Sequence, residues 1–582
     1  MNNREIADLF TQMADLMSIR GDNFHRTLAY RKGADTITGL DRSIAEMVTA
    51  GENLTKLPSI GKTLAAKIKE LVTTGELAAY KKLTKEMPPA LVDLLRVEGL
   101  GPKRVGQIYK QLGVVTLEEL KQAAADGKLE DLPKMGKKSA EKILHNVTAL
   151  LNRGDERTPI GIAYPLAHTI LNELKTLDGV IKAEIGGSLR RSRETIGDID
   201  LLVGIADGTD PMPIMDHFVN RFNVETIEGH GNTKSSVILD SGMKVDLRVL
   251  PIQYWGTLLS YFTGSQAHNV KLRELARKQG LSLNEYSFTS DDGGDDIICA
   301  TEEEVYTTLN LPYIAPQLRE NRGEIEAAQK GKLPELIQQS DIISDLHMHS
   351  TWSDGKFSIL DMARESIRRG LQYIAITDHS YSLGIANGLT PERLWQQRIE
   401  VDAANAQLED EGHTFHIFHG TEMEIRADGT LDFDDDVLAQ LDFVIASLHT
   451  GLRQPRAKVM DRIMAAIDNR YVHMIGHPTG RLLGKRDGAD LDMGAVIMAA
   501  SSSRTILEIN AHPTRLDLNA ANARRAGAMG VKIAINCDAH HTDHFDLLHY
   551  GVANAQRAWL KPRSVINTWP IEKFKRFINY SG

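Results

Sequence analysis

The spacing of apolar residues divides the 582-residue chain into regions. Residues 1–150 carry short helical patterns rich in Ala, Leu and Lys, separated by Gly and Pro. Residues 160–320 mix helices with strand-like segments such as "AEIGGSL", "DIDLLVGI" and "MKVDLRVL". From residue 341 onward, apolar runs such as "YIAITDH" and "TILEINAH" alternate with helical segments, which predicts parallel strands joined by helices. The polar residues 321–340 between the last two regions predict a linker with some helix.

One pattern occurs three times in the first region. The segments are "LPSIGKTLAAKI" (57–68), "VEGLGPKRVGQIY" (97–109) and "LPKMGKKSAEKI" (132–143). We expect the glycine of each to allow a sharp turn, and the free N–H groups of the following helix, with its lysine, to bind phosphates. The repeat resembles the helix-hairpin-helix motif of DNA-binding proteins, and three copies favour this reading over plain helical hairpins with glycine caps. The predicted DNA-backbone contacts are Gly61, Lys62, Gly101, Lys103, Gly136 and Lys137.

The charge and cysteine content bear on the partner and the cellular compartment of the protein. The net charge is −10, but residues 1–150 hold 23 Lys+Arg and 19 Asp+Glu, a net of +4 that leaves −14 for the remainder. A basic head on an acidic body favours a polyanionic partner. The two cysteines cannot form a disulfide framework, and neither the polar start nor any later run suits a membrane. We therefore expect a cytoplasmic protein with no membrane partner. A monomer is our expectation as well, although these features do not address the oligomeric state.

The segment "GGSLRRSRETIGDIDLLV" (186–203) holds the first candidate chemistry. Asp198 and Asp200 are two residues apart in a strand, so both carboxylates lie on one face. Asp246, in "KVDLRV", supplies a third acid, and three carboxylates can hold two hard cations such as Mg²⁺ for phosphoryl transfer. Upstream residues could bind the phosphates through a backbone turn, a hydroxyl and two guanidinium groups: Gly187, Ser188, Arg190 and Arg191.

This arrangement resembles the nucleotidyltransferase fold and, over residues 1–320, the family X DNA polymerases. The stretch "YFTGSQAHNVKLRELA" (261–276) carries the closer resemblance. It implies that Tyr261 and Phe262 line the sugar pocket beside Gly264, that Asn269 reaches the incoming nucleotide, and that Arg273 contacts the template side. It further implies that Ser188 and Arg191 grip the triphosphate of a dNTP, with Mg²⁺ or Mn²⁺ on the three aspartates.

Two positions qualify this resemblance. Lys244 stands two residues before Asp246, where the family often has an arginine that steers the acid, and lysine lacks the planar fork. Lys67 lies where some family members carry the Schiff-base lysine of a deoxyribose-phosphate lyase. A lysine in a desolvated site could act so. A lysine that contacts phosphate, or only solvent, is an equal alternative.

The histidines mark a second candidate centre, because fourteen of the twenty follow residue 340. Nine ligand-type residues stand at the ends of the predicted strands of this region: His347, His349, Asp354, His379, Glu422, His449, His477, Asp538 and His540. Mixed imidazole and carboxylate ligands suit Zn²⁺, Mn²⁺ or Fe²⁺. Nine ligands suit two or three ions with one bridge, which we assign to Glu422, with Glu424 as the alternative, and such a site favours metal-assisted phosphoester hydrolysis.

The order and spacing of these ligands resemble the PHP (polymerase and histidinol phosphatase) domain over residues 341–582. The resemblance implies a distorted (β/α)₇ barrel with a trinuclear site. Together, the two resemblances predict six segments. They are an N-terminal helical domain (1–85), a second helical DNA-binding domain (86–155), a nucleotidyltransferase palm (156–255), a nucleotide-selection subdomain (256–320), a linker (321–340) and the PHP domain (341–582).

The whole order implies a DNA-repair enzyme that acts on gapped or primer–template DNA. Its head would be a gap-filling DNA polymerase that uses dNTPs. Its tail would be a 3′–5′ exonuclease or 3′-end phosphoesterase, with AP-endonuclease activity as an extension. The alternatives for the tail are a small-molecule phosphatase and a catalytically inert scaffold. For the head, the alternative is a nucleotidyltransferase with a non-DNA acceptor.

Overall fold

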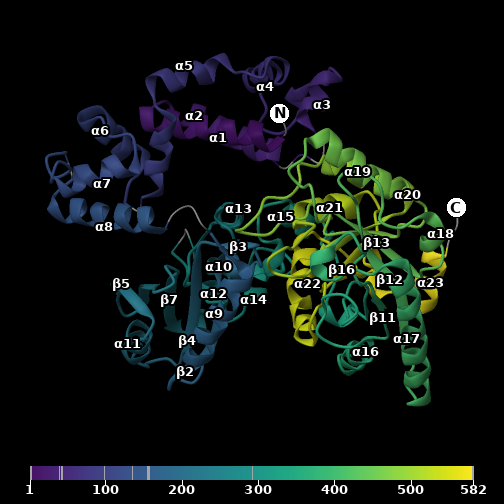
Figure 1. Ribbon diagram of the computed structural model, residues 1–582. Coiled ribbons are helices and arrows are strands. Elements are labelled where there is room, and N and C mark those ends of the chain that lie inside the picture. Colours follow the sequence, from purple (N-terminus) through teal and green to yellow (C-terminus); the bar gives the residue numbers. More distant parts are fainter. Residues whose placement is uncertain are drawn as a thin grey trace. The chain divides into compact units, whose positions relative to one another are not determined.

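The computed structural model describes residues 3–38, 40, 43–97, 99–133, 135–153, 157–290 and 293–579. They form two compact units, Met1–Glu156 and Arg157–Gly582 (Figure 1). The domain boundary expected at residues 155 and 156 falls on positions outside the described residues. No helix within the described ranges has both the length and the apolar character that a membrane span requires.

The first unit is helical, as predicted. Its α-helices are α1 (Asn3–Arg20), α2 (Phe24–Thr38), α3 (Ile44–Thr49), α4 (Lys62–Thr74), α5 (Ala78–Glu86), α6 (Pro102–Leu112), α7 (Leu117–Ala125) and α8 (Lys137–Arg153). One continuous cluster of buried apolar side chains runs through them, from Ile6 and Phe10 in α1 to Val147 in α8. At α7, a capping box between Thr116 and Glu119 satisfies the first free N–H groups.

The repeat glycines have a different role from the one predicted. Gly61 and Gly101 precede α4 and α6 with φ of −78° and −92°, an extended conformation open to any residue. The left-handed residues lie two positions earlier, at Ser59 (φ 60°) and Gly99 (φ 94°). A Cβ at Gly61 or Gly101 would meet nothing within 4 Å. These glycines therefore leave the first turn of each helix bare, so that another molecule can approach its N–H groups.

The second unit begins with a five-stranded sheet of order β2-β4-β7-β6-β5. Its strands are β2 (Val180–Ile185), β4 (Asp198–Ile205), β5 (Val224–His230), β6 (Lys234–Leu239) and β7 (Lys244–Pro251). The helices α9 (Ile160–Leu174) and α11 (Met212–Val219) cover its buried face, and β1 (Thr158–Pro159) pairs with β3 (Thr195–Ile196). The predicted strand "AEIGGSL" is wrong in its second half, since β2 ends at Ile185 and Gly187–Arg190 form the short helix α10.

The next segment is helical with one small hairpin. It contains α12 (Trp255–Thr263), α13 (Gln266–Lys278), β8 (Leu281–Leu283), β9 (Phe288–Ser290), α14 (Glu302–Thr308) and α15 (Glu324–Gln329). Its core is held by a buried guanidinium, because Arg319 is fully buried and pairs with Glu302. Residues 321–340, expected to be a linker with some helix, contain the helix α15, and its Ile325 and Ala328 are buried in this core.

Seven parallel strands then form the predicted barrel, in the sequential order β10 to β16. They are β10 (Ser344–Asp345), β11 (Tyr373–Ile376), β12 (His416–Glu424), β13 (Phe443–Ser447), β14 (Met474–Gly476), β15 (Ile506–Asn510) and β16 (Ile533–Asn536). A bridge between Met348 and Ala539 nearly closes the ring. Because helices surround the ring, the strands are buried on both faces and read as continuous apolar runs (Figure 1).

The barrel helices follow the strands in alternation. They are α16 (Ile359–Arg368), α17 (Pro391–Asp410), α18 (Asp435–Leu438), α19 (Arg456–Asp468), α20 (Met493–Ser503), α21 (Ala520–Ala528), α22 (Leu548–Arg557) and α23 (Ile571–Ile578). Within this second unit the barrel packs directly on the five-stranded domain, since Leu516 and Tyr550 belong to that domain's buried cluster. Gly161 of α9 lies so close to Pro513 that an added Cβ would overlap the proline ring.

Candidate active sites

Three aspartates meet at one edge of the five-stranded sheet. Asp198 and Asp200 project from the same face of β4, with the fully buried Ile199 between them. Strand β7 runs parallel to β4 in a register that places Asp246 beside Asp200. The period-two prediction therefore holds, and β7 supplies the third carboxylate by direct strand pairing.

The charges around these acids are unequal. Burial, with the neighbouring Asp198 and Asp246, raises the pKa of Asp200 to about 7. Burial acts in the same direction on Asp246, but its pKa is lowered overall because Lys234 lies 2.8 Å from Oδ2. The Oδ1 atom of Asp246 is buried without a hydrogen-bond partner. Three clustered acids, one of them with a raised pKa and one with a buried oxygen that lacks a partner, fit a divalent cation.

Lys234 of β6, not Lys244, makes the direct ion pair with the third acid. Lys244 Nζ lies 2.8 Å from Glu228 Oε2. Its charge still contributes to the lowered pKa of Asp246. The resemblance pointed to Lys244, two residues before Asp246 in β7, whereas the cation that contacts Asp246 is Lys234 of the adjacent strand β6.

The turn from Gly186 to Arg191 faces this acidic edge. Gly187 has φ 59°, and a Cβ there would overlap Asp200 Oδ2, so the backbone approaches the carboxylate only because the residue is glycine. Ser188 Oγ is buried and has no hydrogen-bond partner. A buried hydroxyl without a partner, next to the glycine that contacts Asp200, leaves a hydrogen bond to be made to another molecule.

The two arginines after Ser188 are both engaged. Arg190 forms a bidentate pair with Glu302 at 2.9 and 2.8 Å, so its guanidinium is engaged with a carboxylate in this structure. Arg191 is buried, and it donates to Glu320 Oε1 at 3.0 Å and to the Thr263 carbonyl at 2.8 Å. Arg191 is thus the last residue of the turn, and its guanidinium group binds Glu320.

The predicted nucleotide-pocket residues lie together on α12 and α13. The rings of Tyr261 and Phe262 meet edge to face at 5.2 Å, and Arg248 stacks on Phe262 at 4.0 Å. Asn269 donates to the Tyr261 carbonyl at 2.7 Å. A Cβ on Gly264 would overlap the Asn269 side chain. Arg273, one turn beyond Asn269 on α13, is half-buried and lines a small cavity together with Tyr261 and Asn269.

The predicted hairpin contacts in the first unit are open to solvent. Gly61, Lys62, Gly101, Lys103, Gly136 and Lys137 are all exposed at the starts of α4, α6 and α8. Lys67 lies further along α4 and is half-buried. Burial lowers its pKa, and the nearby Arg26 acts in the same direction. A depressed lysine pKa favours the neutral amine that a Schiff base requires.

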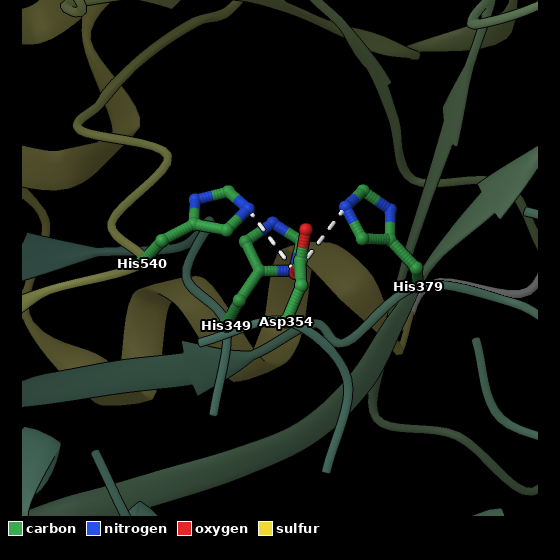
Figure 2. A group of neighbouring side chains, drawn as sticks. All are labelled: His349, Asp354, His379 and His540. Carbon is green, nitrogen blue, oxygen red and sulfur yellow. Dashed lines mark ion pairs between the residues drawn. The ribbon is translucent and has the colours of Figure 1, made fainter. Parts of the chain in front are cut away.

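In the barrel, the ligand-type residues converge from six of the seven strands. Three groups of side chains place their ligand atoms within 4.8 Å of one another: His349, Asp354, His379 and His540; His347, His349, Glu422 and Asp538; and His379, Glu422 and His449. Figure 2 shows the first group, in which His379 and His540 point at Asp354 from opposite sides. His477 joins through Glu422, with Nε2 2.9 Å from Oε1.

Glu422 lies at the centre of this cluster. It is 1% exposed, and imidazole nitrogens of four histidines lie within 3.3 Å of its oxygens: His347, His379, His449 and His477. Despite these distances, both oxygens of Glu422 lack a hydrogen bond, as do Nε2 of His347 and both ring nitrogens of His477. Buried lone pairs that converge without hydrogen bonding to one another are costly unless cations lie between them, so the residues fit a divalent metal cluster.

Two further carboxylates orient the histidines from behind. Glu508 of β15 accepts hydrogen bonds from His347 Nδ1 at 2.8 Å, from the backbone N–H of His477 at 2.7 Å and from Asn536 Nδ2 at 2.9 Å. Glu424 of β12 accepts from His449 Nδ1 at 2.7 Å and from the hydroxyl of Thr450. Each pair directs the other ring nitrogen, Nε2, toward Glu422, an arrangement that fixes tautomer and ring direction in metal sites.

Glu424, the alternative to Glu422 in the sequence, thus supports a ligand, whereas Glu508 was not predicted although the sequence carries a local signal for it. Glu508 is the acid inside the apolar run "ILEIN", and an unpaired carboxylate is rare in a fully buried strand. With it, β15 also contributes, so all seven strands serve the site. The backbone carries a further signal, since His477 (φ 26°) and Asp538 (φ 53°) adopt the left-handed region, which is uncommon outside functional sites.

Together these two centres define a class of protein: a nucleotidyltransferase joined to a barrel with the ligands of a metal-dependent hydrolase. Family profiles agree along the chain. They match as a helix-hairpin-helix domain (1–77), a SAM-like helix-hairpin-helix tandem (91–145), DNA polymerase beta palm (158–241) and thumb (258–320), and a PHP domain (345–512). Asp538 and His540 lie beyond the last match, and only the folded barrel joins them to the other ligands.

Among curated proteins, the chain is 40% identical over 581 residues, 99% of both chains, to the DNA polymerase/3′-5′ exonuclease PolX of Bacillus subtilis (strain 168). It is 26% identical over 350 residues to DNA polymerase lambda of Arabidopsis thaliana, covering 54% of this chain and 62% of that one. It is 30% identical over 250 residues to a probable phosphatase of Thermoanaerobacter sp. (strain X514), covering 41% and 94%. The chain belongs to the PolX family, the family X DNA polymerases with a C-terminal PHP domain.

Proposed function

We propose that this chain fills short gaps in DNA from dNTPs at the three-aspartate centre, and hydrolyses phosphoesters at DNA 3′ ends at the barrel centre. The observation that carries the proposal is the presence of two separate sets of converging ligands in one compact unit. The exposed lysines at three helix starts supply the DNA-backbone contacts that both reactions need.

At the polymerase centre, Asp198, Asp200 and Asp246 would hold Mg²⁺ or Mn²⁺. Such ions lower the pKa of an attacking hydroxyl and offset charge on the leaving phosphate. The chain's own part is to place the nucleotide. Gly187 brings the backbone close to Asp200, Ser188 offers its free hydroxyl, and the Tyr261 and Phe262 rings bound the sugar position.

At the barrel centre, the nine ligands would hold two or three ions of Zn²⁺, Mn²⁺ or Fe²⁺, with Glu422 shared between them. Such ions lower the pKa of bound water and polarise a phosphate. The protein fixes the ligands beforehand, because Glu508 and Glu424 hold His347 and His449 in single orientations. The chain thus supplies a rigid hydrolytic site that needs no ligand from its substrate to form.

A primer on gapped DNA, with and without dNTPs, tests the proposal. Asp198→Ala should abolish extension and spare degradation from the 3′ end. The double variant His347→Ala/His349→Ala should abolish degradation and spare extension. The assay should be run with Mg²⁺ and with Mn²⁺ separately. A single variant that removes both activities would contradict the two-site proposal, and so would a wild-type chain that does neither reaction.

The phosphatase relative supports a second candidate for the barrel, in which it hydrolyses small phosphomonoesters. The fused DNA-binding head argues against it as the main role. Turnover numbers on p-nitrophenyl phosphate and on a DNA 3′ end would separate the two. Faster turnover of the small ester would favour the second candidate.

Finer features belong to the same proposal. The half-buried Lys67, with its lowered pKa, supports lyase activity on abasic DNA, and AP-endonuclease activity would be a further reaction of the barrel. Borohydride traps the Schiff base that a lyase lysine forms with abasic DNA. If Lys67→Ala is trapped as well as the wild type, the lyase role of Lys67 is excluded. The buried, unpaired Cys299 and Cys537 suit a reducing cytoplasm, and we expect a monomer, which light scattering can check.

A further inference from the structure

An arginine of the barrel reaches the phosphate turn of the polymerase domain. Arg557 is the last residue of α22 and is 6% exposed. Its Nη1 donates to the backbone carbonyl of Arg191 at 2.6 Å and to Glu320 Oε1 at 3.0 Å. Arg191 is the C-cap of α10, directly after the turn that holds Gly187 and Ser188. A side chain of the barrel therefore contacts the end of the turn that faces the three aspartates.

Glu320 is shared among three guanidinium groups. Arg191 and Arg557 each lie 3.0 Å from Oε1, and Arg193 lies 3.6 Å from Oε2. The Glu320 side chain is 8% exposed, yet the arginines keep it ionised, since they lower its pKa to about 2 against the effect of burial. A buried carboxylate with one cation would hold that cation firmly. With three guanidinium groups around it, Glu320 binds each one less firmly, because they compete for its two oxygens and repel one another.

A second barrel arginine acts on the same segment. Arg481 donates to both oxygens of Glu194 at 2.9 and 2.8 Å, and to the carbonyl of Arg515 at 2.9 Å. The segment from Arg191 to Glu194 is thus held at both ends by the barrel. The contacts at its two ends differ in kind, because only the Arg557 contact includes the carboxylate that binds Arg191.

We propose that Arg557 is a positioning residue for the incoming nucleotide: it fixes the Arg191 carbonyl and competes with Arg191 for the same oxygen of Glu320, which weakens the hold of Glu320 on the Arg191 guanidinium and lets it turn to the triphosphate. The inference rests on the proposed polymerase function. Without Arg557, Glu320 would have only Arg191 and Arg193 as partners and would hold Arg191 more firmly. The barrel would then support polymerisation as well as its own reaction.

The test is equilibrium binding of a dNTP to the full chain on gapped DNA with a dideoxy-terminated primer and Mg²⁺, measured by titration calorimetry. Arg557→Gln should weaken dNTP binding about tenfold, the effect of losing one charged hydrogen bond. Arg557→Lys, which keeps the charge, should lose less. The double variant Arg557→Gln/Glu320→Gln should regain most of the affinity, because the competing charge is gone. Arg563→Gln, an exposed arginine six residues further along, is the matched control.

Degradation of a single-stranded 3′ end, measured on every variant, reports whether the barrel is folded. A merely structural role of Arg557 predicts that the double variant binds dNTP no better than Arg557→Gln, and that result would overturn the inference. Wild-type affinity in Arg557→Gln would also overturn it. If the wild-type chain binds the dNTP in this manner but never extends a primer, the proposed function fails while the positioning role stands.

Discussion

The two candidate centres hold their ligands in opposite ways. The polymerase centre is three carboxylates on two paired strands, with Asp198 exposed and the phosphate turn completed by contacts from elsewhere. The barrel centre is nine ligands from six strands, six of them buried, and a further layer of carboxylates orients the histidines. The first is an incomplete site that needs its substrate and metal ions together. The second is complete before any substrate arrives, and it should keep its metal.

The largest effect should come from Glu422→Gln. The change removes the one carboxylate that lies among four histidines, so more than one ion should be lost. Degradation of DNA 3′ ends should fall by more than about 100-fold, the upper range for residues that only support a ligand. Gap filling should not change. Glu409→Gln, at an exposed position of α17, is the control, and equal losses in both reactions would refute the separation of the centres.

Gly187→Ala should break the polymerase centre alone. The added methyl group would overlap Asp200 Oδ2, and displacement of a reacting group by about 1 Å can cost about 100-fold in rate. Gly208→Ala is a matched control, since Gly208 also has positive φ (77°) but open space around it. It should lose only about 1 kcal/mol of stability. Similar extension rates in the two variants would mean that the contact with Asp200 is unimportant.

The next prediction concerns the supporting carboxylate of the barrel. Glu508→Gln keeps an acceptor for one partner but removes the charge that holds His347. Metal affinity of the barrel should fall about tenfold, at the lower end for such supporting residues. Competition with a fluorescent chelator measures it. An unchanged affinity would show that strand geometry alone orients His347.

Metal uptake by the barrel should depend on pH. Burial acts to lower the pKa of His449 and His540, but their carboxylate neighbours raise both to about 9. Without metal these histidines are protonated below that pH, so ions must displace protons. The affinity should therefore increase as pH rises from 6 toward 9 and then level off. Affinity that is flat over this range would contradict the charge arrangement around the two rings.

The smallest single effects should come from the hairpin lysines. Lys62→Ala, Lys103→Ala and Lys137→Ala should each weaken DNA binding equally for all sequences and reduce the slope of log affinity against log salt by about 1. Lys110→Ala, on α6 but in its last turn, should leave the slope unchanged. Both reactions should suffer alike, since both centres use the same DNA. An effect on one reaction alone would mean that the hairpins serve a single centre.

The two centres also differ in how far the sequence predicts them. Local spacing was sufficient for Asp198 and Asp200, because strand alternation places both on one face. It was also sufficient to predict parallel strands with ligands at their ends, whereas the number of seven strands came from the resemblance to the PHP domain. What the sequence did not reveal comes from packing between distant segments. Lys234 beside Asp246, Glu508 behind His347, and Glu320 with Arg557 at the phosphate turn are pairs with no fixed spacing.

Direct analysis of bound metal tests the central contrast. The wild-type chain is passed through a desalting column without added metal, and the retained ions are counted by mass spectrometry. The account predicts two or three ions per chain in the wild type and equally in Asp198→Asn/Asp200→Asn, with a loss in Glu422→Gln. Full retention in Glu422→Gln, or a loss in the aspartate variant as large as that in Glu422→Gln, would contradict it.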